Sequence, residues 1–277
     1  MIETEPGQSR AAVLRLLNLG RKDTGENLRD IHQRPVFILS TGRTGTQFLA
    51  HYFDRDPRAH AVHEPSPSRG LRFWTVAYLE GVVERPAMAS TLRRYRTGSF
   101  KNIGAPIYIE SNNFLAGFAE SLIDEFNEPL LIHVVRDPRT YIRSAINNGA
   151  ASGLKGLANR FVPFAHLPLD SEAEHPEILR SALYWNLLNG HLYKVGQGYS
   201  SYHRFRYEDL FIAGTTQFGR LTELVGAGRG EESVVAEEKV NQSPRNLMPS
   251  WAEWSQGQKR VVIETCAEMM ARFGYEL

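Results

Sequence analysis

The chain has 277 residues, of which 42% are hydrophobic and 23% charged, so it can bury a sizeable core, and α/β enzymes of this length commonly form one domain. Its formal net charge of +1 excludes a general electrostatic attraction to nucleic acid or to an anionic membrane, so any anion-binding site must be local. We therefore expect one domain over residues 1–277 and no nucleic-acid partner.

Residues 1–34 are expected to form an N-terminal extension. They are polar except between residues 11 and 19, whose leucine and valine side chains predict a short amphipathic helix. Because this helix is short and lightly charged, we expect it to dock on the domain or on a second subunit of a homo-oligomer, and not to anchor the protein in a membrane. No run approaches 18 apolar residues, and the acidic residues 1–5 do not resemble a signal peptide, so a cytoplasmic protein without a transmembrane segment is expected.

Residues 36–49, with the sequence VFILSTGRTGTQFL, predict a strand, a loop of small residues and a helix. Residues 36–39 are apolar and rich in β-formers, and the apolar residues within 48–53 recur at helical spacing. Gly42 and Gly45 allow the backbone to turn tightly, while the first N–H groups of the helix lack intrahelical partners and point toward the loop. This arrangement predicts an anion-binding site.

The side chains of this loop argue against a nucleoside triphosphate as the anion. Thr46 follows Gly45 directly, so the G-x-x-x-x-G-K-[ST] spacing and its lysine are absent. The loop instead offers one cation, Arg43, and two hydroxyl groups, those of Thr44 and Thr46, followed by Gln47. Because a Gly- and Thr-rich turn is more often an ordinary tight turn, a second anion-binding motif is needed to decide.

A short strand is predicted near residues 59–62, followed by the sequence HEPSP from His63. Its two prolines exclude a helix until about residue 69, so Glu64 is expected in a rigid loop at the carboxyl end of a strand, where open α/β sheets bind their ligands. The alternative role of Glu64 is that of a carboxylate in a surface turn.

Residues 71–97 predict one or two helices with an exposed basic face, to which Arg72, Arg85, Arg93, Arg94 and Arg96 contribute. Such a charge run is more often a solvated face than a patch for an acidic substrate. A third strand is predicted at residues 107–109. The alternation of strands and helices up to this point predicts a parallel sheet.

Residues 130–144 contain the sharpest strand-to-helix transition. The apolar strand 130–135 is followed by Arg136, by Asp137 as the helix N-cap and by Pro138 at the first helical position. Ser144 lies seven residues after Asp137, close to two helical turns, so its hydroxyl is expected to face the point where Arg136 leaves the strand. Arg136 and Ser144 are therefore predicted to converge on one anion.

The sequence Arg-Asp-Pro-Arg of residues 136–139 also occurs at residues 55–58, so the two copies can be compared. The first copy follows a predicted helix, and His63 stands eight residues beyond Arg55, where the second copy has a serine. The four residues alone therefore do not predict an anion site.

The remaining segments predict a lid and a metal-free site. Residues 149–170 are rich in Gly, Ala and Pro and lack periodicity, which predicts a lid over the molecule that the site accepts as its substrate. A long helix follows at about 172–195, with Trp185 in the core, and then a strand at 201–206. Cys266 is the only cysteine, which excludes an internal disulfide, and the sequence has no C-x-x-C or H-E-x-x-H spacing for a metal.

Together, the two motifs resemble those of the sulfotransferases that use 3′-phosphoadenosine 5′-phosphosulfate (PAPS). The 5′-phosphosulfate loop of that family is roughly [GP]-x-[KR]-[ST]-G-[ST]-[ST], and its 3′-phosphate site has an Arg at a strand end and a Ser eight residues later. The resemblance, to a bacterial or Golgi-like branch, implies an α/β fold of the P-loop type, three layers with a central parallel sheet flanked by helices. It implies PAPS as the donor, bound by Gly42, Arg43, Thr44, Gly45, Thr46, Gln47, Arg136 and Ser144, with Arg245 added from the tail.

The resemblance also implies a general base. The cytosolic branch has a His after the third strand, where this chain has Glu110-Ser111-Asn112-Asn113. In other branches a Glu after the second strand resembles the base, and Glu64 occupies that place in this chain. The resemblance also implies that Arg43 acts on the leaving group. His63 is the rival of Glu64, because neighbours in an extended segment point to opposite sides and only one can face the site.

The expected reaction is transfer of a sulfuryl group to a hydroxyl or an amine of a small-molecule, lipid or carbohydrate acceptor. Two alternatives stay open. A P-loop kinase of small molecules would need the missing loop lysine and a set of Mg²⁺ ligands. A non-catalytic nucleotide-binding module would share the fold and lack the chemistry.

Overall fold

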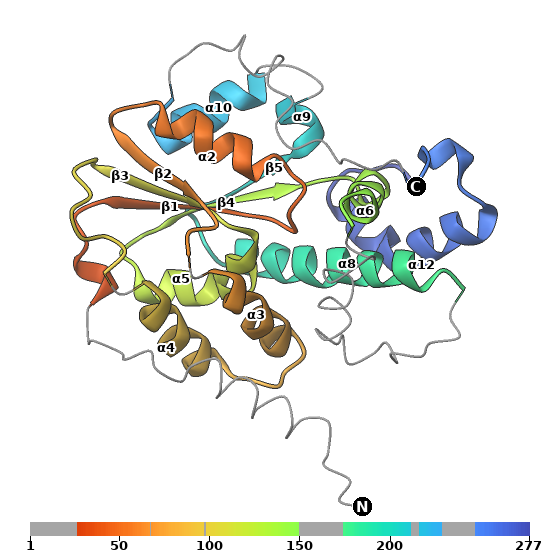
Figure 1. Cartoon of the computed structure of the whole chain (residues 1–277), viewed down its shortest axis with the longest axis horizontal. Coiled ribbons are helices and arrows are strands. Elements are labelled where there is room, and N and C mark those ends of the chain that lie inside the picture. The colour runs from red at the N-terminus through yellow and green to blue at the C-terminus, as the bar shows by residue number, and fades with distance from the viewer. Residues whose placement is uncertain (1–26, 67, 97, 150–173, 212–215, 229–246) are drawn as a thin grey trace, which may run out of the picture.

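The computed structural model describes residues 27–66, 68–96, 98–149, 174–211, 216–228 and 247–277. A sheet of five parallel strands separates two layers of helices (Figure 1). The strands are β1 (Arg34–Leu39), β2 (Ala59–His63), β3 (Ile107–Ser111), β4 (Leu130–Val135) and β5 (Tyr202–Arg206), in the spatial order β2-β3-β1-β4-β5. The predicted fold class, a three-layer α/β fold with a central parallel sheet, is confirmed.

Helices connect these strands and cover both faces of the sheet. The α-helices are α2 (Thr46–Asp54), α3 (Leu71–Leu79), α4 (Arg85–Arg96), α5 (Ala119–Glu125), α6 (Pro138–Asn147), α8 (Pro176–Gln197), α9 (Tyr207–Phe211), α10 (Thr216–Val225) and α12 (Gln256–Arg272). Short 3-10 helices are η1 (Leu28–Asp30), η2 (Ser68–Gly70), η3 (Asn113–Phe118) and η4 (Trp251–Glu253).

Strand β1 shows how the apolar pattern builds the two layers. Val36 and Ile38 pack in the cluster that contains α2 and α10, whereas Phe37 and Leu39 pack in the cluster that contains α3, α4 and α5. Figure 1 shows these two sets of helices on opposite faces of the sheet. Because side chains alternate along a strand, a continuous apolar run buries both faces, and each fully buried side chain contributes about 1.5 to 3 kcal/mol.

A third cluster joins α6, α8 and α12 beyond the end of β4. Trp185 of α8 is fully buried there, which confirms its predicted place in the core. Its indole Nε1 donates a hydrogen bond of 2.8 Å to the carbonyl oxygen of Arg136. The core thus holds the backbone of the residue that leaves β4.

The predicted exposed basic face is wrong at Arg96. This side chain, in the last turn of α4, is buried and forms an ion pair with the buried carboxylate of Glu110 on β3. Arg85 and Arg93 lie closer to the surface and pair with Asp124 and Glu125, each with a nitrogen–oxygen distance of 2.6 Å. Because α4 packs against α5, and its last turn reaches Glu110, its arginines pair with carboxylates that the local sequence pattern does not reveal.

Several sequence predictions lie outside the described residues: the helix within residues 11–19, nearly all of the lid segment 149–170, and Arg245. Among the helices that are described, none is both long and apolar enough to cross a membrane.

Candidate active site

The predicted site residues that the structure describes follow the strands at one edge of the sheet, where the parallel strands end. His63 of β2 and Ile38 of β1 both pair in register with Ser111 of β3, and Leu39 pairs with His133 of β4. The segments that follow β1, β2, β3 and β4 therefore emerge side by side. This is the edge at which open α/β sheets bind ligands.

The loop after β1 has a backbone that depends on its glycines. Gly42, Arg43 and Gly45 have φ angles of +83°, +60° and +75°. A Cβ atom on Gly45 would lie 2.7 Å from the ring of Phe211, and one on Gly42 would lie 3.0 Å from the side-chain amide nitrogen of Asn113. The loop is therefore a tight turn into α2, as predicted, and it packs closely against its neighbours.

Arg43 links this loop to the second predicted motif. Its Nε donates to the hydroxyl of Ser144 at 3.1 Å, and its carbonyl oxygen accepts from Nη1 of Arg136 at 2.6 Å. Asp137 caps α6 and Pro138 occupies its first turn, as predicted. The structure therefore brings Arg43, Arg136 and Ser144 together from two distant parts of the sequence.

Two guanidinium groups in this cluster have lost part of their hydration. Burial, followed by the positive charge of Arg136, lowers the pKa of Arg43. Burial also lowers the pKa of Arg136, whose guanidinium lies 4.4 Å from the ring centroid of Tyr207. An anion placed beside both cations would offset their repulsion and their lost hydration.

The hydroxyl group of Thr44 indicates whether the loop fits an anionic ligand. Its side chain is buried, and within the described part of the chain its hydroxyl has no hydrogen-bond partner. Buried polar groups in folded proteins almost always have one. A hydroxyl donor left over in a glycine-rich turn, next to two cations, fits a phosphate oxygen.

On the other side of β1, the end of β2 carries His63 and Glu64. The carbonyl oxygen of Ser111 lies 3.0 Å from Nδ1 of His63 and accepts the backbone N–H of Glu64 at 3.1 Å. Because a carbonyl only accepts, the proton of the neutral imidazole is assigned to Nδ1. Nε2 is then the basic nitrogen, and it lies 3.7 Å from Oε1 of Glu64.

The expectation that these two neighbouring side chains point to opposite sides is wrong, because Nε2 of His63 lies 3.7 Å from Oε1 of Glu64. Glu64 has a φ angle of +43°, so the backbone leaves the extended conformation at that residue. The alternation of side chains holds only along an extended strand. His63 and Glu64 consequently lie on the same side.

Comparison with known proteins adds to this geometry. No family model and no curated protein matches the sequence. Among solved structures, the sulfotransferase domain from the curacin biosynthetic pathway aligns over 91% of this chain and 100% of its own, with a TM-score of 0.55 and 13% identity. A sulfotransferase from Mycobacterium avium aligns over 99% of this chain and 87% of its own, with a TM-score of 0.54 and 14% identity. This chain has the sulfotransferase fold.

Within this sulfotransferase fold, two tyrosines that sequence reasoning missed are affected by charged residues from both sides of the site. Burial, with the neighbouring Tyr184, raises the pKa of Tyr141, while the positive charges of Arg72 and Arg43 oppose the rise. Burial also raises the pKa of Tyr184, which Arg72 again opposes and Glu64 reinforces. Tyr141 and Tyr184 lie in helical segments whose apolar pattern is typical of core positions, so no local signal marks them.

Proposed function

We propose that this protein is a sulfotransferase that moves a sulfuryl group from PAPS to a hydroxyl or amine acceptor. The observation that carries the proposal is the contact of Arg43 with Ser144 and Arg136, which unites two cations and a hydroxyl from two motifs. The sulfotransferase fold supports it, because the cluster lies at the ligand-binding edge of the sheet.

The donor side would be formed by the loop and by the start of α6. Gly42, Arg43, Thr44, Gly45, Thr46 and Gln47 would hold the 5′ side of the nucleotide, and Arg136 and Ser144 the 3′-phosphate. PAPS would supply an activated sulfuryl group, whose bond to the 5′-phosphate breaks during transfer. Arg43 would offset the negative charge that remains on that phosphate, and a rigid loop would keep the guanidinium in line.

On the acceptor side, Glu64 would act as the general base. Its carboxylate needs no large pKa shift, because the acceptor loses its proton only as the new bond to sulfur forms. His63 lies beside it with Nε2 as the basic nitrogen, so both residues are tested together.

Donor identity is tested first by thermal shift with adenosine 3′,5′-bisphosphate, ADP-Mg²⁺ and ATP-Mg²⁺. We expect the bisphosphate to stabilise the protein most, because only it carries the 3′-phosphate that Arg136 and Ser144 would bind. Stabilisation by ATP-Mg²⁺ alone would indicate the alternative, a small-molecule kinase. Labelled PAPS incubated with small-molecule, lipid and carbohydrate extracts then identifies the acceptor, and binding without transfer would indicate a non-catalytic module.

The base is tested with Glu64→Gln and His63→Gln. The first substitution keeps the shape of the side chain and removes its basicity, so turnover should fall about 10² to 10⁴-fold with unchanged affinity for adenosine 3′,5′-bisphosphate. His63→Gln should lower turnover much less than Glu64→Gln. If His63→Gln loses turnover while Glu64→Gln keeps it, the roles are reversed.

A further inference from the structure

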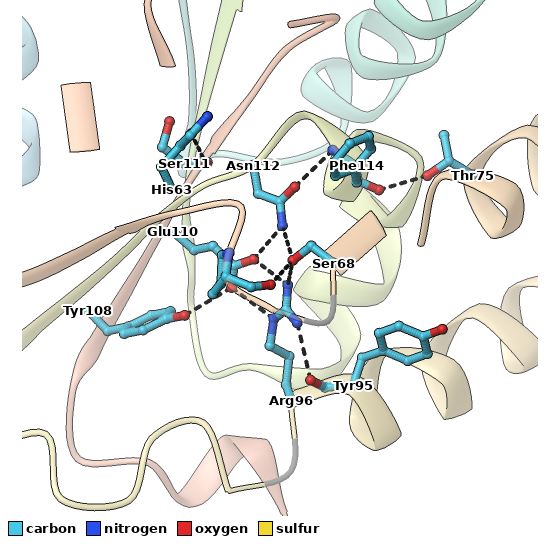
Figure 2. Close-up of polar contacts among 11 residues, drawn as sticks. His63, Ser68, Thr75, Tyr95, Arg96, Tyr108, Glu110, Ser111, Asn112 and Phe114 are labelled. Atoms are coloured by element: carbon cyan, nitrogen blue, oxygen red, sulfur yellow. Dashed lines mark hydrogen bonds and ion pairs between the residues drawn. The ribbon is translucent and has the colours of Figure 1, made fainter. Parts of the chain in front are cut away.

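We propose that a buried polar network of Ser68, Arg96 and Glu110 positions the Glu64 loop, the segment of Glu64 and Pro65 after β2, for catalysis. Figure 2 shows the side chains of Ser68, Arg96 and Glu110 pointing toward one another. Arg96 lies in the last turn of α4, and Glu110 lies on β3. The inference rests on the proposed function, because it assigns a role to residues that support the proposed base.

The centre of the network is the ion pair of Arg96 and Glu110. Arg96 is 1% exposed and Glu110 is fully buried. Nε of Arg96 donates to Oε2 of Glu110 at 2.8 Å, and Nη2 donates to Oε1. The same carboxylate accepts from the hydroxyl of Tyr108 at 3.0 Å and from the side-chain amide of Asn112 at 2.7 Å. Every oxygen of the buried carboxylate is thus hydrogen-bonded, which such a pair requires in order to offset its lost hydration.

Ser68 connects this pair to the loop, and the donor types fix the direction of its hydrogen bonds. Its Oγ lies 3.2 Å from Nη2 of Arg96 and 2.9 Å from Nδ2 of Asn112. Both partners can only donate, so the hydroxyl accepts from both and its own proton goes to the carbonyl oxygen of Pro65. The backbone N–H of Ser68 donates to the same carbonyl at 2.9 Å.

This contact matters because Pro65 follows Glu64 directly. A φ angle of +43° is unfavourable for a residue with a side chain and persists only where the surroundings hold it. The carbonyl of Ser111 holds the N–H of Glu64, and Ser68 holds the carbonyl of Pro65. The unusual backbone of Glu64 is therefore fixed from both sides.

The carboxyl end of β3 is also bonded to the proposed donor loop, residues 42–47, and to β1 before it. The hydroxyl of Ser111 donates to the carbonyl oxygen of Thr46 at 2.8 Å, and the N–H of Asn112 donates to that of Ile38 at 3.0 Å. Residues 110–112 are thus bonded both to the segments around the donor loop and to the Glu64 loop. The network would set the distance between the proposed base and the proposed donor.

The test compares Ser68→Ala with a matched control, Thr75→Val. Both side chains are 1% exposed, and each hydroxyl donates to a backbone carbonyl, that of Thr75 to Phe114 at 2.9 Å. Only Ser68 contacts the Glu64 loop. We expect Ser68→Ala to lower kcat about 10- to 100-fold with an unchanged KM for PAPS, because a small misplacement of a reacting group has effects of that size. Thr75→Val should keep kcat within about twofold.

Assays use the full chain, labelled PAPS and the acceptor found with it. Ser68→Cys, which keeps the side-chain size and donates weakly, serves as the second variant and should give an intermediate kcat. The inference is overturned if Ser68→Ala retains kcat while Glu64→Gln loses it, or if Thr75→Val loses as much as Ser68→Ala. If Glu64→Gln itself retains full turnover, the proposed base is wrong, and this positioning role falls with it.

Discussion

The sequence Arg-Asp-Pro-Arg occurs twice, and the two copies fold alike over their last three residues. Asp56 accepts from the N–H of Arg58 at 3.0 Å and from its guanidinium at 2.6 Å. Asp137 accepts from the N–H of Arg139 at 2.8 Å and from its guanidinium at 2.6 Å. Aspartate, proline and arginine therefore form the same local turn in both places.

The two copies differ at their first arginine and in what surrounds it. Arg55 follows α2, and its Nη2 lies 3.1 Å from Nε2 of His51 in an exposed position. Arg136 follows β4, contacts the backbone of Arg43 and lies over the ring of Tyr207. The local turn therefore forms in either setting, whereas a cation that contacts the loop after β1 has to leave the end of a neighbouring central strand.

The largest expected difference is in donor binding after removal of the first arginine. Arg136→Ala should weaken binding of adenosine 3′,5′-bisphosphate by about 1.5 to 3 kcal/mol, roughly 10- to 150-fold, because alanine cannot replace charge-assisted hydrogen bonds. Arg55→Ala is the matched control and should leave the affinity unchanged. Calorimetry on folded variants decides, and equal affinities for the two variants would remove the 3′-phosphate assignment of Arg136.

The two aspartates should resemble each other in stability and differ in binding. Asp56→Ala and Asp137→Ala each remove a carboxylate that accepts from backbone and guanidinium, so each should lower the free energy of unfolding by about 1 to 2 kcal/mol. Only Asp137 begins the helix that carries Ser144, so only its substitution should also weaken bisphosphate binding. Urea unfolding and calorimetry measure the two effects. Weaker binding by the Asp56 variant would contradict the distinction.

Ser144→Ala should have a smaller effect than Arg136→Ala. It removes a neutral hydroxyl, which accepts from Nε of Arg43, and should weaken bisphosphate binding by about 0.5 to 1.5 kcal/mol. The same calorimetric titration measures it. An effect larger than that of Arg136→Ala would show that the serine, and not the arginine, dominates the site.

The smallest expected effect is a dependence of stability on pH at the first copy. Hydrogen bonds from Arg58 lower the pKa of Asp56 below its usual value. The unfolded carboxyl, with a pKa of about 3.9, therefore binds protons first as the pH falls, and the stabilisation that is present above this pH is lost below it. Between pH 7 and 4 this loss is only about 0.3 kcal/mol, and it grows below pH 4. The free energy of unfolding of Asp56→Asn, measured from pH 7 to below pH 4, should fall less steeply with decreasing pH than that of the unsubstituted protein. An equal fall would show that Asp56 does not contribute to this pH dependence.

Much of the fold was predictable because its signals are local. The continuous apolar runs at residues 36–39 and 130–135 predicted buried parallel strands, and both strands are there. Asp137 and Pro138 predicted the start of α6 by their own backbone chemistry. The order of strands carries no such signal, because it depends on pairing between segments far apart in the chain.

In the candidate site, too, some features follow from local sequence signals and others depend on contacts between distant segments. The sequence by itself determined which side chains stand at strand ends, among them Arg43, Glu64 and Arg136, because periodicity and turn residues place them there. Only the tertiary structure decided their partners: Ser144 for Arg43, and Glu110 for Arg96, which local pattern had assigned to an exposed face. A charged residue's sequence neighbours reveal its type and position, but the group that balances its charge comes from elsewhere in the chain and becomes its neighbour only when the sheet and helices pack.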